Sequence, residues 1–441
     1  MNRPPDFVST RDGARTPRSF EHALRRGLAP DGGLYVPTAV PPLAAGWREA
    51  ADWQQLVEAV LRPWFAEDEA DAWLSAAREA LDFPVPVRLL SGRRGLLELH
   101  HGPTLAFKDV AARTMARWLG RSLRARGESA TVLVATSGDT GSAVADGFAG
   151  VAGLRVVILY PAGRVSPIQE RQLTVPREGV DALAVEGDFD ACQRLAKAAL
   201  VDPALRGLRL SSANSINIGR LLPQITYHVW GALQLARALD VALEEVLSVV
   251  PSGNLGNLLA GLLATAMGLP SAGFVAAHNA NDHFPRVLRG EADPSAAPAT
   301  IATVSNAMDV GAPSNLERLL ALFPQGRYPV PLQGTSIGDA ATLAAIARTY
   351  HDDGVLVCPH TAVGLEALRA VRERASGGAP DEPALVLATA HPAKFPEVVE
   401  RALPSVRASH PRLEGLPPAR PLAQLPAQPE ALRSWLLEHQ A

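Results

Sequence analysis

From about residue 95 onward, short apolar runs alternate with longer stretches in which apolar residues recur every three or four positions. Short runs rich in β-branched residues predict strands, and the longer periodic stretches predict amphipathic helices. We expect strands at residues 95–99, 131–135, 155–160, 182–185, 245–250, 273–277, 354–357 and 385–389. We expect helices at residues 109–126, 140–150, 167–173, 189–200, 218–239, 258–267, 337–350 and 363–374. This alternation predicts an α/β protein with parallel sheets covered by helices on both faces.

The same pattern divides the chain into four parts. Residues 1–94 predict a helical N-terminal extension, and its tryptophans are expected to pack in a core: Trp47, Trp53, Trp64 and Trp73. Residues 95–230 and 231–403 predict two α/β domains, since a chain of 441 residues is longer than one core usually supports. From residue 404 a proline-rich tail, expected to wrap the surface, leads to a short helix at 430–440.

The helix expected at 337–350 has a start signal of its own. Ser336 is followed three residues later by Asp339. This spacing is typical of a capping box, in which Asp partly replaces the usual Glu or Gln. We therefore expect Ser336 to cap this helix.

Charge and cysteine content narrow the classes of partner. With 42 basic and 45 acidic residues the formal net charge is −3, which gives no reason to expect a nucleic acid or an anionic membrane as partner. A small-molecule partner fits better. The two cysteines, Cys192 and Cys358, lie far apart and without metal-ligand spacing. We therefore expect no disulfide and no metal site.

Neither a secretory signal nor a membrane span is expected. The first thirty residues are polar, carry six arginines and contain no apolar core. The longest uncharged apolar segment, residues 255–277, is broken by Gly268, Pro270 and Gly273, which predicts a helix, a turn and a strand. We therefore expect a protein of the cytoplasm.

Lys108 is the first candidate for chemistry. It follows a turn signal at Gly102 and Pro103 and an apolar triplet, and it stands at the start of a predicted helix. A cation there opposes the helix dipole, so it is poorly placed unless an anion or a covalent partner offsets its charge. The alternative is an ordinary solvated surface lysine, the commonest place for this residue type.

A glycine-rich segment, PSGNLGN at residues 251–257, links a predicted strand to a predicted helix. Gly253 and Gly256 allow positive φ and a close approach of the backbone, so several N–H groups can converge on a phosphate at the helix start. The alternative is an ordinary turn between a strand and a helix.

A second group of anion-binding residues follows at 214–220. Asn214, Ser215, Asn217 and Arg220 offer two amides, a hydroxyl and a guanidinium within two helical turns, and arginine binds phosphate bidentately. The alternative is structural, because an Asn-Ser-x-Asn run is also a good helix cap.

Seven segments in one order carry a resemblance to a known family. They are GLAPDGGLYVP (27–37), HGPTLAFKDVA (101–111), ATSGDTGSA (135–143), SANSINIGRLLPQITYH (212–228), VPSGNLGNLLAG (250–261), VSNAMDV (304–310) and ATAHPAKF (388–395). Together they resemble the threonine synthase family, within the fold type II enzymes that depend on pyridoxal 5'-phosphate (PLP). The resemblance covers nearly the whole chain and implies two α/β domains like those of tryptophan synthase β, with an N-terminal extension.

The resemblance implies how PLP would be bound. Lys108 matches the lysine that joins the cofactor's aldehyde and later acts as a base, and Asp139 matches the position that faces the ring hydroxyl. Thr389, at the end of an apolar strand, matches the hydroxyl residue beside the ring nitrogen. The phosphate loop would comprise Gly253, Asn254, Leu255, Gly256 and Asn257. This loop departs from the commonest family pattern, with Leu255 in place of Phe and Asn257 in place of Asp. His391 and Lys394 either add positive charge near the cofactor or cap the next helix.

The implied substrate is O-phosphohomoserine, which water converts to threonine and phosphate in the last step of threonine biosynthesis. The residues expected to bind it are Thr136, Ser137, Asn214, Ser215 and Arg220. The alternatives are a related phospho-lyase that releases a keto acid, a lyase of the serine/threonine dehydratase kind, and a PLP-binding protein that has lost turnover. We expect a monomer or a homodimer.

Overall fold

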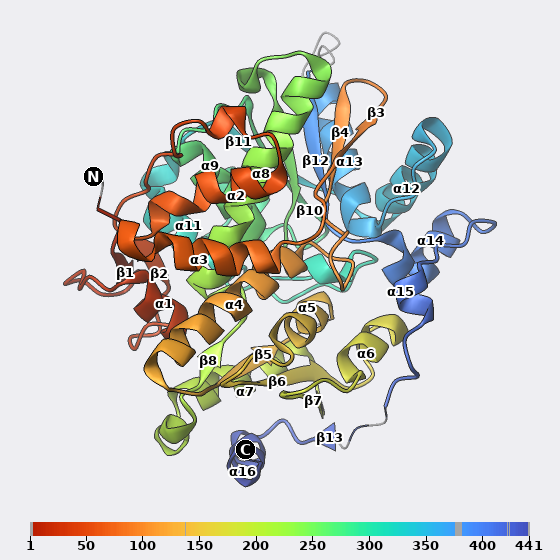
Figure 1. Cartoon of the computed structure of the whole chain (residues 1–441). Coiled ribbons are helices and arrows are strands. Elements are labelled where there is room, and N and C mark those ends of the chain that lie inside the picture. Colours follow the sequence, from red (N-terminus) through yellow and green to blue (C-terminus); the bar gives the residue numbers. More distant parts are fainter. Residues whose placement is uncertain (1–2, 137, 375–381, 421, 423, 440–441) are drawn as a thin grey trace.

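The computed structural model describes residues 3–136, 138–374, 382–420, 422 and 424–439. Its N-terminal part contains α1 (Phe20–Arg26), α2 (Trp53–Leu61) and α3 (Glu67–Ala80), with a short antiparallel pair of strands, β1 (Phe7–Ser9) and β2 (Tyr35–Pro37) (Figure 1). The four tryptophans of this part are buried, as predicted: Trp47, Trp53, Trp64 and Trp73.

Aromatic packing attaches this N-terminal part to α4 (Lys108–Arg126). Trp73 of α3 and Trp118 of α4 meet edge to face with 6.3 Å between ring centroids, and Trp118 Nε1 donates a hydrogen bond to the carbonyl of Trp73 at 2.9 Å. Phe20 packs against both rings at 5.4 and 5.3 Å. Such pairs stabilise beyond the area that they bury. The helix that begins with Lys108 is therefore held from behind by the N-terminal extension.

The larger sheet has six strands in the order β11-β10-β9-β12-β4-β3, all parallel except β3. Its strands are β3 (Val87–Leu90), β4 (Arg94–Glu98), β9 (Leu247–Pro251), β10 (Gly273–His278), β11 (Leu332–Ser336) and β12 (Ala384–Ala388). α8 (Ile218–Leu239) and α9 (Gly256–Ala266) belong to the core on one face, and α12 (Asp339–Asp353) and α13 (Pro359–Arg374) to the core on the other. Adjacent strand residues point to opposite cores, as Leu385 and Val386 do.

The second sheet has five parallel strands in the order β13-β7-β6-β5-β8. They are β5 (Ala130–Ala135), β6 (Leu154–Pro161), β7 (Val180–Val185), β8 (Ser211–Ser212) and β13 (Gln424–Leu425). α4 and α5 (Asp139–Phe148) pack on one face, and α7 (Phe189–Val201) and α16 (Pro429–Glu438) share the core of the other face. The remaining helices are α6 (Pro167–Thr174), α10 (His283–Leu288), α11 (Asn315–Leu322), α14 (Pro396–Ala402) and α15 (Pro411–Glu414).

The strand at the start of the predicted first α/β domain lies in the other sheet. β4 pairs with β12, so that Leu97 is opposite Leu387, and it does not pair with β5. The predicted domain boundary at residue 95 therefore differs from the observed architecture, in which the larger sheet combines strands from early and late parts of the chain. The apolar pattern of a strand indicates that the strand is buried, but it does not indicate which strand pairs with it. Here the two paired strands, β4 and β12, are also far apart in the sequence.

Two local predictions were wrong. Residues 354–357 form no strand; Val355 and Val357 are buried without ladder partners, on the segment between α12 and α13. Ser336 does not cap α12, because it ends β11 and its Oγ donates to the carbonyl of Asn279 at 3.0 Å. Asp339 instead accepts a hydrogen bond from Val304 N at 3.2 Å.

The C-terminal segment crosses from the larger sheet to the smaller one. In Figure 1 it descends from α14 and α15 past the edge of the five-stranded sheet to β13 and α16. Gln424 and Leu425 pair with β7, and Leu432 and Leu436 of α16 are fully buried. The tail thus completes the smaller sheet and part of its core.

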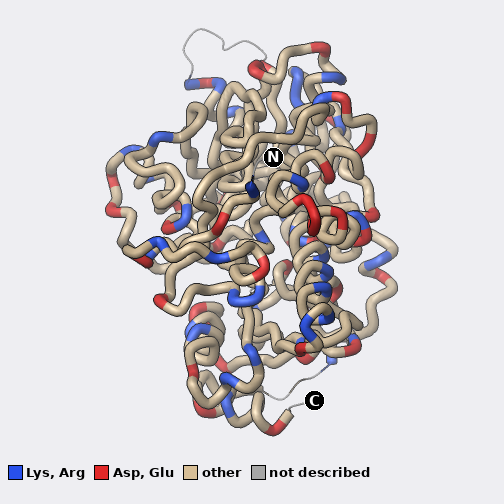
Figure 2. Tube along the Cα trace, turned by 60° about the vertical axis from the view of Figure 1, so that its left-hand side comes forward, with Lys and Arg blue, Asp and Glu red and all other residues tan. Residues whose placement is uncertain are grey.

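Figure 2 shows acidic and basic residues interspersed along the chain. Within the described part of the chain, no helix combines the length and apolar character needed to cross a membrane.

Candidate active site

One cavity is lined by residues that follow strands of both large sheets. Lys108, Asp139, Arg220, Gly253 and Thr389 all line it. Ligands of parallel sheets collect at the carboxyl ends of the strands, where these residues lie. Lys108 and the turn at Gly253 therefore face a common cavity.

Lys108 is held at the start of α4 by the residues around it. The Asp109 carboxylate accepts hydrogen bonds from Thr104 N at 2.8 Å and Thr104 Oγ1 at 2.5 Å, which closes the loop before the helix. A Cβ at Gly102 would lie 2.5 Å from Asp109 Oδ2, so this position needs glycine. Phe107 N donates to the carbonyl of Thr389 at 2.8 Å and ties the loop to the end of β12. These contacts aim the lysine into the cavity.

The Lys108 amine is easier to deprotonate than an ordinary lysine. Its pKa is lowered to about 8, chiefly by burial; the charge of Asp139 opposes this shift, and the positive charges of Lys394 and Arg220 contribute to it. Its Nζ also lies 4.8 Å from the centre of the Phe107 ring. This amine therefore loses its proton more readily than an ordinary lysine, which suits both attack on an aldehyde and proton transfer.

A buried ion pair lies beside Lys108. Lys394 Nζ is 2.9 Å from Asp139 Oδ1, and Gln169 Nε2 donates to the same oxygen at 3.1 Å. Burial alone would raise the pKa of Asp139, but the charges of Lys394 and Lys108 outweigh it and lower the pKa below its usual range. The carboxylate is therefore ionised. Lys394 adds positive charge to this site, and it also donates to the carbonyl of Thr104 at 2.9 Å.

The loop between β9 and α9 has the properties of a phosphate cradle. None of the backbone N–H groups from Gly253 to Asn257 donates a hydrogen bond to another described residue. These donors are at the start of a helix of 11 residues, where an anion is favoured. The positive φ of the loop, +61°, belongs to Leu255 and not to a glycine. The expectation of positive φ at Gly253 and Gly256 was therefore wrong.

Gly253 is needed for a close approach of two backbone segments. A Cβ there would lie 2.9 Å from Met308 Cα, and backbone cannot move aside as a side chain can. A Cβ at Gly256 would meet only ordinary contacts at 3.5 Å or more.

We expect Gly253→Ala to weaken PLP affinity about 5- to 150-fold, since forcing a methyl group into packed surroundings costs about 1–3 kcal/mol. The measurement is a titration of the cofactor-free protein with PLP. Gly207→Ala is the matched control, because nothing lies within 4 Å of a Cβ at Gly207. Unchanged affinity in Gly253→Ala would contradict the assignment of this loop.

Arg220 is a buried cation that faces the cavity. It is 4% exposed, and its Nη1 donates to the carbonyl of Ala213 at 2.5 Å. Its Nε is buried without a partner, and no carboxylate among the described residues forms an ion pair with it. Burial lowers the pKa of Arg220 to about 10, so it stays charged at neutral pH. A buried charge without a protein counter-ion is costly unless a ligand supplies the opposite charge.

Three family models match the chain. A model of pyridoxal-phosphate dependent enzymes matches residues 96–389, a model of the threonine synthase N terminus matches residues 6–78, and a model of the threonine synthase C-terminal region matches residues 361–434. The threonine synthase of Escherichia coli K12 is 40% identical over 437 residues, which cover 96% of this chain and 97% of that protein. The chain belongs to the threonine synthase family.

Other threonine synthases are similar in sequence and in structure. The enzyme of Serratia marcescens is 41% identical over 396 residues, 87% of this chain and 88% of that protein. The crystal structure of the Escherichia coli enzyme covers 99% of this chain and 100% of its own, with 37% identity and a TM-score of 0.88. The PLP-bound structure from Brucella melitensis covers 99% of both chains, with 36% identity and a TM-score of 0.86. The predicted fold type II architecture and its PLP dependence are thus confirmed.

Several residues predicted to bind anions or substrate form hydrogen bonds to other parts of this threonine synthase family member. Asn214 uses its amide on the backbone of Ala135, donating at 2.7 Å and accepting at 3.3 Å. Asn217 caps α8 through Gly219 N, as the structural alternative predicted. The hydroxyl of Thr136 accepts from Gly138 N and Gly141 N at 3.0 and 2.8 Å. Ser137 lies outside the described residues.

Ser215 is bonded to Asn254, and both line the cavity that Arg220 faces. Asn254 Nδ2 donates to Ser215 Oγ at 2.5 Å, and its Oδ1 accepts from Ser314 N at 2.5 Å. Asn254 thus links the phosphate loop to the loop before α8. Asn257 points away, because its Oδ1 accepts from Tyr227 OH at 2.8 Å in the interior. Of the two asparagines of the loop, only Asn254 has its side chain bonded to a residue predicted to bind substrate.

Several cavity residues were not expected from the sequence. His360 lines the cavity, its Nε2 accepts from Ala307 N at 3.1 Å, and burial lowers its pKa to about 4, so the ring is neutral. The sequence shows only an isolated histidine after a loop, which carries no signal. α7 contributes the exposed Lys197 and its neighbour Gln193 to the wall. Their spacing of four, one helical turn, was the available signal.

Proposed function

We propose that this member of the threonine synthase family converts O-phosphohomoserine and water to threonine and phosphate. The observation that carries the proposal is the buried Arg220 guanidinium, which pairs with no carboxylate in the described part of the chain and faces the same cavity as the loop at Gly253. PLP brings one phosphate and the substrate brings another. A cavity with two separate places for an anion matches this pair.

The residues that would hold PLP fit its three polar parts. Lys108 would bind its aldehyde carbon, the N–H groups of residues 253–257 its phosphate, and the Thr389 hydroxyl its ring nitrogen. Asp139, kept ionised by Lys394, would face the ring hydroxyl. When bound, PLP supplies an acceptor for the electrons left on the substrate carbon.

The remaining steps belong to this chain's own side chains. Lys108, with a pKa of about 8, would take protons from Cα and Cβ of the substrate and return a proton to Cγ after the phosphate has left. Arg220 would hold the γ-phosphate and stabilise its departure, and Ser215 and Asn254 line the same cavity. Water then adds at Cβ. One substrate and one water give one threonine and one phosphate, so the atoms balance.

A serine/threonine dehydratase function fits this cavity less well. Its substrates carry no phosphate and would leave the charge of Arg220 without a partner, at a cost in stability. A phospho-lyase acting on the same substrate would use the same residues and differs only in where water attacks. The similarity to threonine synthases over nearly the whole chain supports the synthase outcome.

Product analysis tests the proposal. Purified protein with PLP and O-phosphohomoserine should release threonine and phosphate in equal amounts, measured by chromatography and phosphate assay. Serine and threonine, supplied alone, should give little product. Ketobutyrate with ammonia in place of threonine would show a phospho-lyase, and normal PLP absorbance without any product would show a PLP-binding protein.

The setting of the enzyme follows from the same proposal. Its substrate and cofactor are phosphorylated small molecules, and we expect neither a nucleic acid nor a membrane as a partner. We expect activity in the cytoplasm, by a monomer or a homodimer, and sedimentation analysis of the holoenzyme distinguishes the two states.

A further inference from the structure

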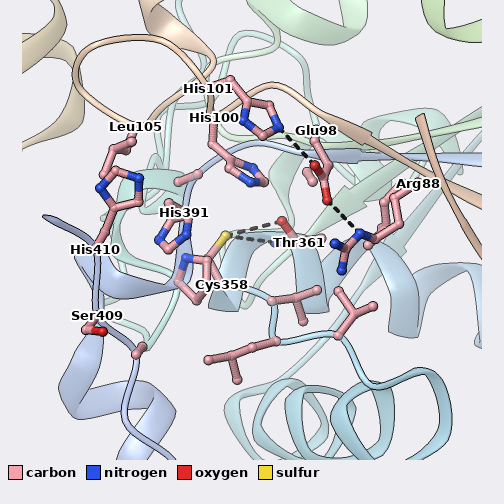
Figure 3. Close-up of a pocket in the computed structure, with 18 of the residues that line it drawn as sticks. Arg88, Glu98, His100, His101, Leu105, Cys358, Thr361, His391, Ser409 and His410 are labelled. Atoms are coloured by element: carbon pink, nitrogen blue, oxygen red, sulfur yellow. Dashed lines mark hydrogen bonds and ion pairs between the residues drawn. The ribbon is translucent and has the colours of Figure 1, made fainter. Parts of the chain in front are cut away.

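A second cavity of about 510 Å³ lies apart from the active site and shares none of its lining residues. It is bounded by the end of β4, the segment that leads to α4, the ends of β12 and of the 355–358 segment, and residues 407–412 of the tail. Figure 3 shows histidine rings gathered around it. The rings are those of His100, His101, His391 and His410.

Three side chains bring their donor atoms together here. One ligand atom each of Glu98, His100 and His101 lies within 4.8 Å of the others. His101 Nε2 is 2.9 Å from Glu98 Oε2, and the rings of His100 and His101 stack with 4.9 Å between centroids. The two nitrogens and one oxygen belong to four consecutive residues at the end of a strand.

The polar atoms of this cluster are arranged as metal ligands usually are. Arg88 Nε binds Glu98 Oε1 at 3.1 Å, which leaves Oε2 facing the imidazoles. Carboxylates that bind a metal are commonly oriented by such an outer contact. His100 Nδ1 is buried and has no hydrogen-bond partner in the described part of the chain. A buried nitrogen without a partner is costly, and a metal ion would satisfy it.

The types of donor atom in this cluster also indicate which kind of ion or molecule it can bind. Two imidazoles and one carboxylate suit zinc and similar transition metals, whereas calcium and magnesium prefer oxygen ligands alone. An anion is less well served, because two of the three arginines that line the cavity are engaged and the third, Arg407, is exposed. Arg88 pairs with Glu98, and Arg412 Nη1 donates to the carbonyls of His101 and Gly102 at 3.2 and 2.8 Å.

We propose that Glu98, His100 and His101 form a binding site for one zinc-like divalent ion, with water from the cavity completing its coordination. The site is independent of the proposed reaction. It ties the end of β4 to the segment that leads into α4, and so an ion there stabilises the folded chain. The expectation of no metal site rested on the spacing of cysteines and did not consider this Glu-x-His-His run.

The test uses holoenzyme treated with a chelator and then dialysed. Calorimetric titration with Zn²⁺ should show one saturable site per chain, and Co²⁺ should give the visible absorbance typical of a four-coordinate site. Glu98→Gln and His101→Ala should each weaken binding at least about tenfold, the lower end of what even outer contacts contribute. Zn²⁺ should raise the thermal midpoint of the parent and not of these variants.

Matched controls separate this site from other zinc ligands. His351→Gln changes an exposed histidine on α12 and should leave Zn²⁺ affinity unchanged. Cys358→Ser removes the thiol that lines the same cavity and should also leave it unchanged. The PLP absorbance of each variant reports that it is folded. The proposal is overturned by the absence of saturable binding, by equal affinity in Glu98→Gln and the parent, or by loss of binding in Cys358→Ser.

Discussion

Replacing Lys108 by alanine should remove the visible absorbance of bound PLP and lower turnover by more than about ten-thousandfold. General acid–base catalysis alone contributes about 10²–10⁴, and this variant also loses the covalent attachment of the cofactor. Lys394, the other lysine deep in the site, is not expected to replace Lys108, because its amine is bonded to Asp139 and to the carbonyl of Thr104. Absorbance after dialysis and a threonine assay are the measurements.

Lys197→Ala is the control for this prediction. Lys197 lines the same cavity from α7 but is exposed. Its replacement should leave the PLP absorbance intact. If Lys108→Ala kept the absorbance after dialysis, another lysine would hold the cofactor and the assignment of the site would be wrong.

Replacing Arg220 by alanine should leave the PLP absorbance unchanged and lower kcat/KM for O-phosphohomoserine about a hundredfold or more. A hydrogen bond to a charged group contributes about 1.5–3 kcal/mol, and loss of positioning adds to it. Arg220→Lys should recover only part of the loss, because an ammonium lacks the planar fork of the guanidinium. Inhibition by inorganic phosphate should weaken in parallel with kcat/KM.

The phosphate measurement separates binding from a structural role, since Arg220 also donates to the carbonyl of Ala213. Arg237→Ala is the matched control. This arginine lies on the same helix and likewise donates to backbone carbonyls, those of Ala50 and Arg48. It should keep its kinetics within about twofold, as substitutions outside such a site do. Parent-like kinetics in Arg220→Ala would favour an unphosphorylated substrate.

The sequence predicted those parts of the site that depend on neighbours in the chain. Lys108 has a turn, an apolar triplet and a helix start beside it, and the loop at 251–257 has a strand, two glycines and a helix start. Such signals are local, and the structure brings both segments to one cavity. Even there the detail differed, because Leu255 and not a glycine takes the positive φ.

The parts that the sequence did not predict depend on contacts between distant segments. Asn214 was expected to bind substrate, yet its amide is used by Ala135, which comes 79 residues earlier. Ser336 had the spacing of a helix cap, but its hydroxyl bonds to Asn279 across the end of β11. The pairing of β4 with β12 is of the same kind. A pattern of residue types indicates which kinds of partner a side chain is able to bind. It does not indicate which of these partners the fold places next to it.

The position of β13 has a consequence for synthesis of the chain. β7 would be an open edge of its sheet without Gln424 and Leu425, and α16 covers the apolar residues of α7 beside it. An open strand edge next to an apolar face promotes association between chains. Because the ribosome makes β7 long before β13, the edge stays open while the intervening segments are translated. During that interval the nascent chain carries an open edge at which chains can associate, a hazard that chaperones counter.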